Sequence, residues 1–191
     1  MTYYVSESFD KINFTEHRLL IGEYEQCTFS NCDFSHFEFS NHKFVECEFI
    51  RCNLSVAKLI MTAFREVKFK DCKMLGLRFE DCNEFGLAVS FDGCILNLCS
   101  FFKTKMNKTI FKSSQLQEVD FTECDLTSAV FDNCNLLSAT FDRTILEKAD
   151  FRTSVNYSID PENNRIKKAK FSFSGVLGLL DKYNIEIDRT K

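Results

Sequence analysis

Large apolar residues recur along this chain at every fifth position, most regularly between Phe121 and Phe151. In that stretch they are Phe121, Leu126, Phe131, Leu136, Phe141, Leu146 and Phe151. A small residue stands two positions before each of them, in the order Val119, Cys124, Ala129, Cys134, Ala139, Thr144 and Ala149. An amphipathic helix repeats about every 3.6 residues and a half-buried strand about every two, so neither explains the pattern. The spacing predicts a structural repeat of five residues.

A five-residue unit can build a closed coil if each unit turns the chain by about a right angle. Four such units return the chain to its starting direction, and successive coils then stack at the spacing of hydrogen-bonded strands, about 4.8 Å. The large residue would point inward from the middle of a side. The small residue would point inward near a corner, where there is less room. The pattern therefore predicts an all-β solenoid with four sides.

Several units, CDLTS, AVFDN, CNLLS, ATFDR and ADFRT, follow the pattern A(D/N)LXX. Over nearly its whole length the chain resembles the pentapeptide-repeat proteins, which that pattern defines. The resemblance implies a right-handed quadrilateral β-helix. It implies no reaction, because the family is defined by its backbone. Some members, the quinolone-resistance (Qnr) proteins, resemble a DNA duplex in width and negative charge and engage two type II topoisomerases, DNA gyrase and topoisomerase IV.

The repeat falls into two registers that differ by two residues. One series of centres runs from Phe9 to Phe79 and the other from Phe91 to Phe151, and Phe79 and Phe91 are 12 positions apart. We therefore expect the β-helix over residues 1–156, with a register shift at 80–90.

Two interpretations of the shifted segment remain open. A lone carboxylate is costly to bury, so Glu84 is not expected to point inward. In the first interpretation Phe85 turns inward in its place, and Gly86 permits the backbone to bend. In the second, the segment is a loop that presents Glu84 and Phe85 to a partner. Phe102, beside Lys103 and expected to point outward, is a third candidate partner-binding residue.

The five-residue pattern weakens after Phe151, and residues 157–191 are expected to form a C-terminal cap. RIKKAKF (165–171) alternates like a strand, SGVLGLLDKY (174–183) predicts a short α-helix, and IEI (185–187) predicts another strand. The helix is more apolar than a cap requires. We therefore expect Val176, Leu177, Leu179 and Leu180 to form the interface of a homodimer joined at its C-terminal ends, as the family resemblance also implies.

The ten cysteines favour packing over metal binding or disulfides. Each lies two residues before a repeat centre, in the small inward position, where a thiol behaves as a compact apolar side chain. None of the spacings is the CxxC of a zinc site. The chain shows no export signal and no apolar segment long enough to span a membrane, so free thiols indicate a cytoplasmic protein.

Charge is unevenly distributed along the sequence. Residues 1–50 carry nine acidic and three basic side chains, residues 51–112 six and eleven, and residues 113–156 eight and three. A DNA mimic needs continuous negative charge, so the basic belt at 51–112 fits mimicry poorly. An alternative function is therefore a structural or scaffolding module that binds a protein and leaves DNA topology unchanged.

The sequence contains no motif that indicates catalysis. The three histidines do not form a catalytic arrangement with the serines or cysteines, and no phosphate-binding glycine loop is present. We expect no catalytic residue, metal, cofactor, small-molecule substrate, membrane or direct nucleic-acid contact. The expected activity is the presentation of a rigid charged surface to a protein partner, with a type II topoisomerase as the most concrete candidate.

Overall fold

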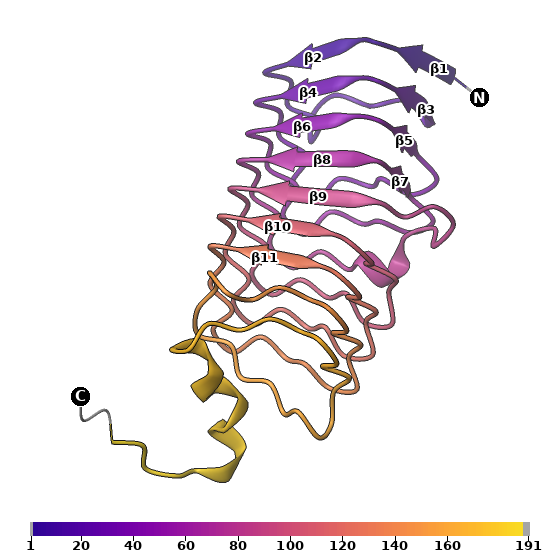
Figure 1. The fold of residues 1–191 in the computed structure, drawn as a ribbon. Coiled ribbons are helices and arrows are strands. Elements are labelled where there is room, and N and C mark those ends of the chain that lie inside the picture. The colour runs from indigo at the N-terminus through magenta and orange to yellow at the C-terminus, as the bar shows by residue number, and fades with distance from the viewer. Residues whose placement is uncertain (1, 189–191) are drawn as a thin grey trace.

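The computed structural model describes residues 2–188, which form a right-handed β-helix with a quadrilateral cross-section (Figure 1). Each five-residue unit makes one side of a coil, and its centre and the residue two before it are the buried positions. The chain turns each corner at a residue with a left-handed backbone, such as Gln26 (φ 53°) or Asn31 (φ 56°). The coils pair in parallel, with Phe29 opposite Phe49 and Phe111 opposite Phe131.

We number the four faces in the order in which the chain visits them. The first face contains a four-stranded sheet of β1 (Thr2–Val5), β3 (Gly22–Glu25), β5 (Lys43–Val45) and β7 (Ala63–Arg65). The second contains a seven-stranded sheet of β2 (Ser8–Asp10), β4 (Thr28–Ser30), β6 (Glu48–Ile50), β8 (Val67–Lys70), β9 (Val89–Asp92), β10 (Ile110–Lys112) and β11 (Val130–Asp132).

On the third and fourth faces, successive coils are connected by isolated β-bridges instead of strands. On the third face the bridged residues are Asn13, Asp33, Asn53, Lys73, Ile95, Gln115, Asn135 and Val155. The steps between them amount to seven turns of the solenoid. On the fourth face, bridges join Glu38 to Lys58 and connect Arg78, Ser100, Asp120 and Thr140.

Stacked aromatic rings fill the core behind the second face. From Phe9 to Phe171 the rings of successive coils lie nearly parallel, with centroids between 4.6 and 5.6 Å apart. The small inward position beside this column often holds a cysteine that donates to a carbonyl one coil back, as Cys47 Sγ does to Tyr24 O at 3.2 Å. The period of five therefore places both the large and the small residues of the core.

One coil is two residues longer than its neighbours. Val67 of β8 pairs with Val89 of β9, and Lys73 pairs with Ile95, whereas pairs in the flanking coils are 20 positions apart. Just before the extra residues lies a 3-10 helix, η1 (Phe79–Asp81). The surplus is accommodated in the loop 83–87, which interrupts the first face between β7 and the later coils.

The C-terminal segment differs from the predicted helix and strands. Two short 3-10 helices, η2 (Gly175–Leu179) and η3 (Asp181–Tyr183), replace the α-helix. The reason lies in the backbone, because the Gly178 carbonyl accepts from Ile159 N at 3.0 Å and is not available to a following helical turn. Glycine is also a poor helix former. The predicted strand at 185–187 is likewise absent from the structure.

Residues 165–171 form two further repeat units, so the predicted separate strand there is also wrong. Arg165 pairs with Ile145 and Lys170 pairs with Asp150, and the Phe171 ring stacks on Phe151 at 5.5 Å. Lys residues at the outward positions caused the alternation seen in the sequence. The coil thus extends past position 156, and the cap begins after Phe171.

The two ends of the solenoid differ. At the C-terminal end, η2 and η3 lie over the last coil (Figure 1). At the N-terminal end of the described chain, β1 and β2 are edge strands. Tyr4 and Phe9 are only partly buried there, and they line a hollow of about 590 Å³.

Candidate functional site

The loop 83–87 points its aromatic residue outward. Asn83 begins the turn, with its Oδ1 accepting from Phe85 N at 2.9 Å, and Gly86 supplies a left-handed backbone with φ 71°. Phe85 is 75% exposed, and the Arg65 guanidinium lies 5.5 Å from its ring centroid. Leu87 packs against the core instead. The interpretation in which Phe85 turns inward is therefore wrong, and Glu84 is exposed beside it.

A pocket of about 370 Å³ opens where this loop meets the next coil. It is lined by Phe79, Glu80, Cys82, Glu84, Leu87, Phe102, Lys103, Thr104 and Lys105. Two of the three partner-binding residues predicted from the sequence, Glu84 and Phe102, thus line one hollow, although 18 positions separate them. The Lys103 ammonium lies 4.8 Å from the Phe102 ring centroid.

Exposed apolar side chains gather around this pocket on and beside the fourth face. We name them the fourth-face patch: the exposed Val56, Ile60, Met61, Phe85 and Leu98, together with the partly buried Phe102. They come from two coils, with a coil between them that carries charged side chains. In that coil Arg78 forms ion pairs with Glu80 at 3.2 Å and with Asp81 at 3.4 Å. The surface therefore consists of apolar side chains from two coils, with the ion pairs of Arg78 between them.

Three residues of the patch occupy backbone positions that suit them badly. Val56 (φ 59°), Met61 (φ 55°) and Leu98 (φ 62°) are left-handed corner residues. Every other left-handed corner in residues 2–188 carries a polar, charged or glycine residue. A bulky L-residue in this conformation is strained, and β-branched valine most of all. The strain is concentrated on one surface, which the sequence analysis missed because it did not sort corners by residue type.

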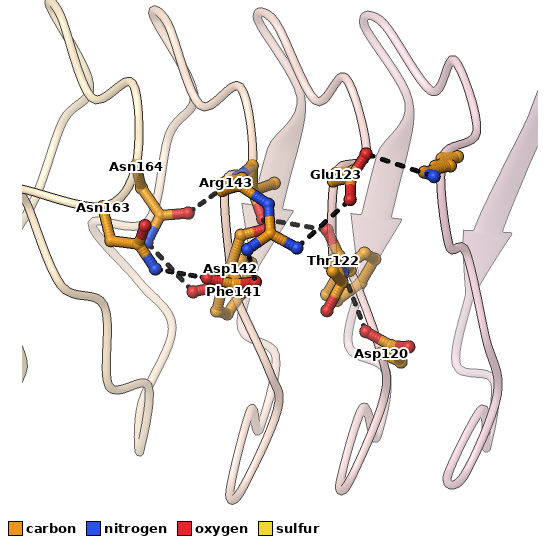
Figure 2. A network of polar contacts seen from close by, with 11 residues as sticks. Asp120, Thr122, Glu123, Phe141, Asp142, Arg143, Asn163 and Asn164 are labelled. Carbon is orange, nitrogen blue, oxygen red and sulfur yellow. Dashed lines mark hydrogen bonds and ion pairs between the residues drawn. The ribbon is translucent and has the colours of Figure 1, made fainter.

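Toward the C-terminal end, the same face becomes a polar ladder (Figure 2). Arg143 bridges Asp142 at 2.8 Å and Glu123 at 3.2 Å, and Glu123 also pairs with Lys103 at 3.5 Å. Asn163 donates to Asp142, and Asn164 Oδ1 accepts from Thr144 N at 2.8 Å. Glu123 and Asp142 are thus paired with Arg143 and Lys103, within a coil or between coils, which neutralises part of the negative charge that a DNA mimic requires.

The C-terminal end carries a second apolar surface. Of the residues predicted for a dimer interface, Val176 is exposed, Leu177 and Leu180 are partly buried, and Leu179 packs against the last coil. The sequence analysis missed Phe173, which is 97% exposed at the same end. Lys182 holds η3 to the coil through Asp160 and Glu162, each at 2.7 Å.

The described residues offer little for catalysis or metal binding. All ten cysteines are buried and free, and burial raises the pKa of Cys47 and of Cys124 to about 12. His42 is buried too, and its pKa is lowered by that burial. Within residues 2–188, no group of His, Cys, Asp and Glu is arranged to hold a metal, and no helix is long and apolar enough to cross a membrane.

The stacked coils and left-handed corners define a class of protein: β-solenoids in which each side of a coil is five residues long. The sequence profile of the pentapeptide repeat region matches residues 23–84 and 87–151, more than half of the chain. The chain belongs to the pentapeptide-repeat family. The interval between the two matched segments falls within the loop.

Solved structures share the fold at low sequence identity. Full-length QnrB1, a plasmid-mediated fluoroquinolone resistance protein, matches with a TM-score of 0.54 and 15% identity, covering 96% of this chain and 100% of its own. HetL from the cyanobacterium Nostoc, a pentapeptide-repeat protein involved in heterocyst differentiation regulation, matches with a TM-score of 0.50 and 14% identity, covering 91% and 87%. No curated protein matches the chain.

Proposed function

We propose that this chain is a non-enzymatic module that binds a protein partner through the fourth-face patch. The observation that carries the proposal is the grouping of apolar residues at strained corners around the loop. Strained residues persist where the surrounding structure holds them and they are typical of functional surfaces. Exposed aromatic, methionine and arginine side chains are also enriched in protein interfaces.

The proposed interface has its anchors at the edge of the pocket. Phe85 and Phe102 present aromatic rings, and each ring already has a cation beside it, from Arg65 and Lys103. Aromatic and arginine side chains supply most of the energy of typical interfaces. The rigid coils hold these groups in place, so little conformational entropy is lost when a partner binds.

Differential capture from a cell lysate tests this proposal. The patch variant carries Leu98→Ser and Met61→Ser, at residues 59% and 54% exposed. The control carries Leu137→Ser and Val155→Ser, at residues 50% and 54% exposed outside the fourth-face patch. A partner retained by the native protein and the control, and lost by the patch variant, is the expected result. Equal retention by both variants would refute the assignment to this surface.

For the identity of the partner, we infer a type II topoisomerase as the first candidate to test. The shared fold with QnrB1 supports it. The matched charges of Figure 2 and the short loop support a scaffolding role without effect on DNA topology. Gyrase supercoiling with the purified protein, with and without a fluoroquinolone, separates the two. Rescue from the drug, or inhibition without it, indicates a topoisomerase partner, and no effect at large protein excess indicates scaffolding.

We further propose a homodimer through the C-terminal end. Exposed Phe173 and Val176 support it, with Leu177 and Leu180 partly buried beside them. Light scattering should give twice the chain mass for the native protein and the chain mass for a Phe173→Ser, Val176→Ser variant. A native protein that stays monomeric at high concentration excludes this interface. The ten free thiols support a reducing, cytoplasmic setting for the molecule.

A further inference from the structure

The charge of the outward residues on the first face differs between the two sides of the loop 83–87. The half on the C-terminal side is basic. Six cations project there: Lys105, Lys108, Lys148, Arg165, Lys167 and Lys168, named here the basic strip. Only two acidic residues, Asp125 and Glu147, lie on the same part of the face. The strip has an excess of four positive charges on a chain whose formal net charge is −4.

The corner backbone aligns part of the strip. Lys108, Lys148 and Lys168 are all left-handed corner residues, with φ between 60° and 61°. They lie along one edge of the solenoid, with Ser128 at the same corner in the coil between the first two. At about 4.8 Å per coil, the three-coil step from Lys108 to Lys168 covers about 14 Å. The edge therefore presents its charges in a line.

The lysines of the strip lack ion pairs, in contrast to several lysines of the N-terminal coils. Lys43, Lys58 and Lys68 each pair with a glutamate of the preceding coil, at 3.7, 3.3 and 3.4 Å. No such pair exists for the five lysines of the strip within residues 2–188. Arg165 and Glu147 do pair, at 2.6 Å, and Asp125 accepts from Asn107 and Thr127. The unmatched charge on this surface is therefore positive.

The composition of the strip fits a nucleic acid better than a protein. Protein interfaces are depleted in lysine at their core and rich in aromatic residues. Protein–nucleic acid interfaces are polar and strongly positive. Apart from Asp125, Glu147 and the partly buried Ile145, the outward residues of this half of the face are lysine, arginine, asparagine, threonine and serine, with no exposed aromatic side chain among its described residues. Single strands are typically held by stacking on aromatic rings, so their absence favours a duplex.

We propose that the basic strip binds the phosphate backbone of double-stranded nucleic acid without reading its sequence. A duplex carries one negative charge per about 1.7 Å of axis, so about 14 Å of duplex carries about eight phosphates on its two strands, and those on the near side lie within reach of the strip. The corner lysines contact one line of phosphates, and Lys105 and Lys167 contact the neighbouring groove rim. This departs from the expectation of no direct nucleic-acid contact. It is independent of the fourth-face patch.

Fluorescence anisotropy with short labelled DNA and RNA duplexes tests the proposal. We expect binding at low salt, with log K falling against log salt at a slope of about −4. Lys108→Gln, Lys148→Gln and Lys168→Gln together should reduce the slope by about three and weaken binding at least tenfold. The matched control, Lys43→Gln, Lys58→Gln and Lys68→Gln, changes the net charge by the same amount and should bind like the native protein.

Each remaining outcome bears on the proposal directly. Equal loss of affinity in both triple variants would overturn it, because net charge alone would then explain binding. Competition by polyglutamate as strong as by duplex would assign the strip to an acidic protein instead. No binding by the native protein at low salt also overturns it. The DNA and RNA arms identify which duplex is preferred, and circular dichroism verifies that all variants are folded.

Discussion

At the scale of single residues, the core is a set of rings held from two directions. Phe131 is 1% exposed, stacks on Phe111 at 4.9 Å and on Phe151 at 4.6 Å, and meets Phe121 edge to face. Offset stacking and edge-to-face contacts add to the gain from burying the ring itself. Removal of one ring therefore disturbs its neighbours above, below and beside it.

Phe131→Ala should lower the free energy of unfolding by about 3–5 kcal/mol, because the coils above and below cannot close the resulting cavity. Phe131→Leu is the control and should cost less than about 1.5 kcal/mol, since most of the volume remains. Urea denaturation measures both. An alanine variant as stable as the native protein would show that this ring is not part of the packed column.

The thiols should be countable only after unfolding. All ten are buried, and burial raises the pKa of most of them, to about 11 for Cys32 and Cys134. A thiol with so high a pKa is almost entirely protonated near neutral pH, and the thiolate is the reactive form. Hydrogen bonding with Cys72 lowers the pKa of Cys52 and of Cys94, which are equally inaccessible. Titration with a chromogenic thiol reagent should be slow in buffer and complete in denaturant. Fast labelling of most thiols in the native state would contradict their inward placement.

At the scale of elements, corners and sides have different requirements. Each side of a coil needs a large and a small inward residue. Each corner needs a left-handed backbone at the last residue of the five-residue unit. Asparagine adopts this conformation readily because its short side chain bonds locally, and valine does not. The corners at Asn31, Asn41 and Asn133 meet this requirement, and the corner at Val56 does not.

Val56→Asn should raise the free energy of unfolding by about 1 kcal/mol, since it relieves left-handed strain. Val155→Asn is the control, because Val155 is similarly exposed and lies on a bridge instead of a corner. Thermal unfolding compares the two variants. The same Val56 change should weaken the partner capture proposed above, so stability and binding move in opposite directions. A lower melting temperature for Val56→Asn would contradict the strain argument.

The inward residues could be predicted from the sequence because burial is set locally, by position within each unit. The centres from Phe121 to Phe151 and all ten cysteines are buried as their spacing indicates. The cap could not be predicted in the same way. Its backbone depends on contacts between distant positions, such as the hydrogen bond between Gly178 and Ile159, which lie 19 positions apart.

The candidate surfaces were harder to predict because they join distant segments. Lys108 and Lys168 lie on one edge, yet a count along the sequence puts them in different charge zones, with an acidic zone between. A sum over consecutive residues mixes all four faces. Once every position is assigned to a face and a coil, the strip can be read directly from the sequence.

At the scale of the whole molecule, η2 and η3 cover the last coil, whereas the first coil of the described chain has a neighbouring coil on one side only. The hollow beside Tyr4 and Phe9 exposes core rings, and β1 and β2 contact other strands on one side only. In a solenoid each coil is stabilised mainly by its neighbours. The first coil of the described chain therefore has about half the supporting contacts of a coil in the middle.

Hydrogen exchange should follow this gradient. Amides of β1 and β2 should exchange fastest among the strands, and those of β9 and β10 slowest, because local opening is easiest where contacts are fewest. Mass spectrometry of peptides from the exchanging protein resolves the two groups. Uniform protection along the strands would instead indicate that the first coil is covered in solution.

The longer coil also interrupts the regular repeat of the sequence, which matters while the chain is folding. Coils of equal length and similar pattern could stack out of order, one skipping its neighbour, with the apolar residues still inside. Within either half the paired residues are 20 positions apart, so a skipped coil there keeps the register, whereas a pairing that crosses 83–87 keeps the apolar residues inside only if the two extra residues are looped out. The loop therefore distinguishes the two halves of the solenoid by register, which reduces the number of nearly equivalent stackings that compete with the native one.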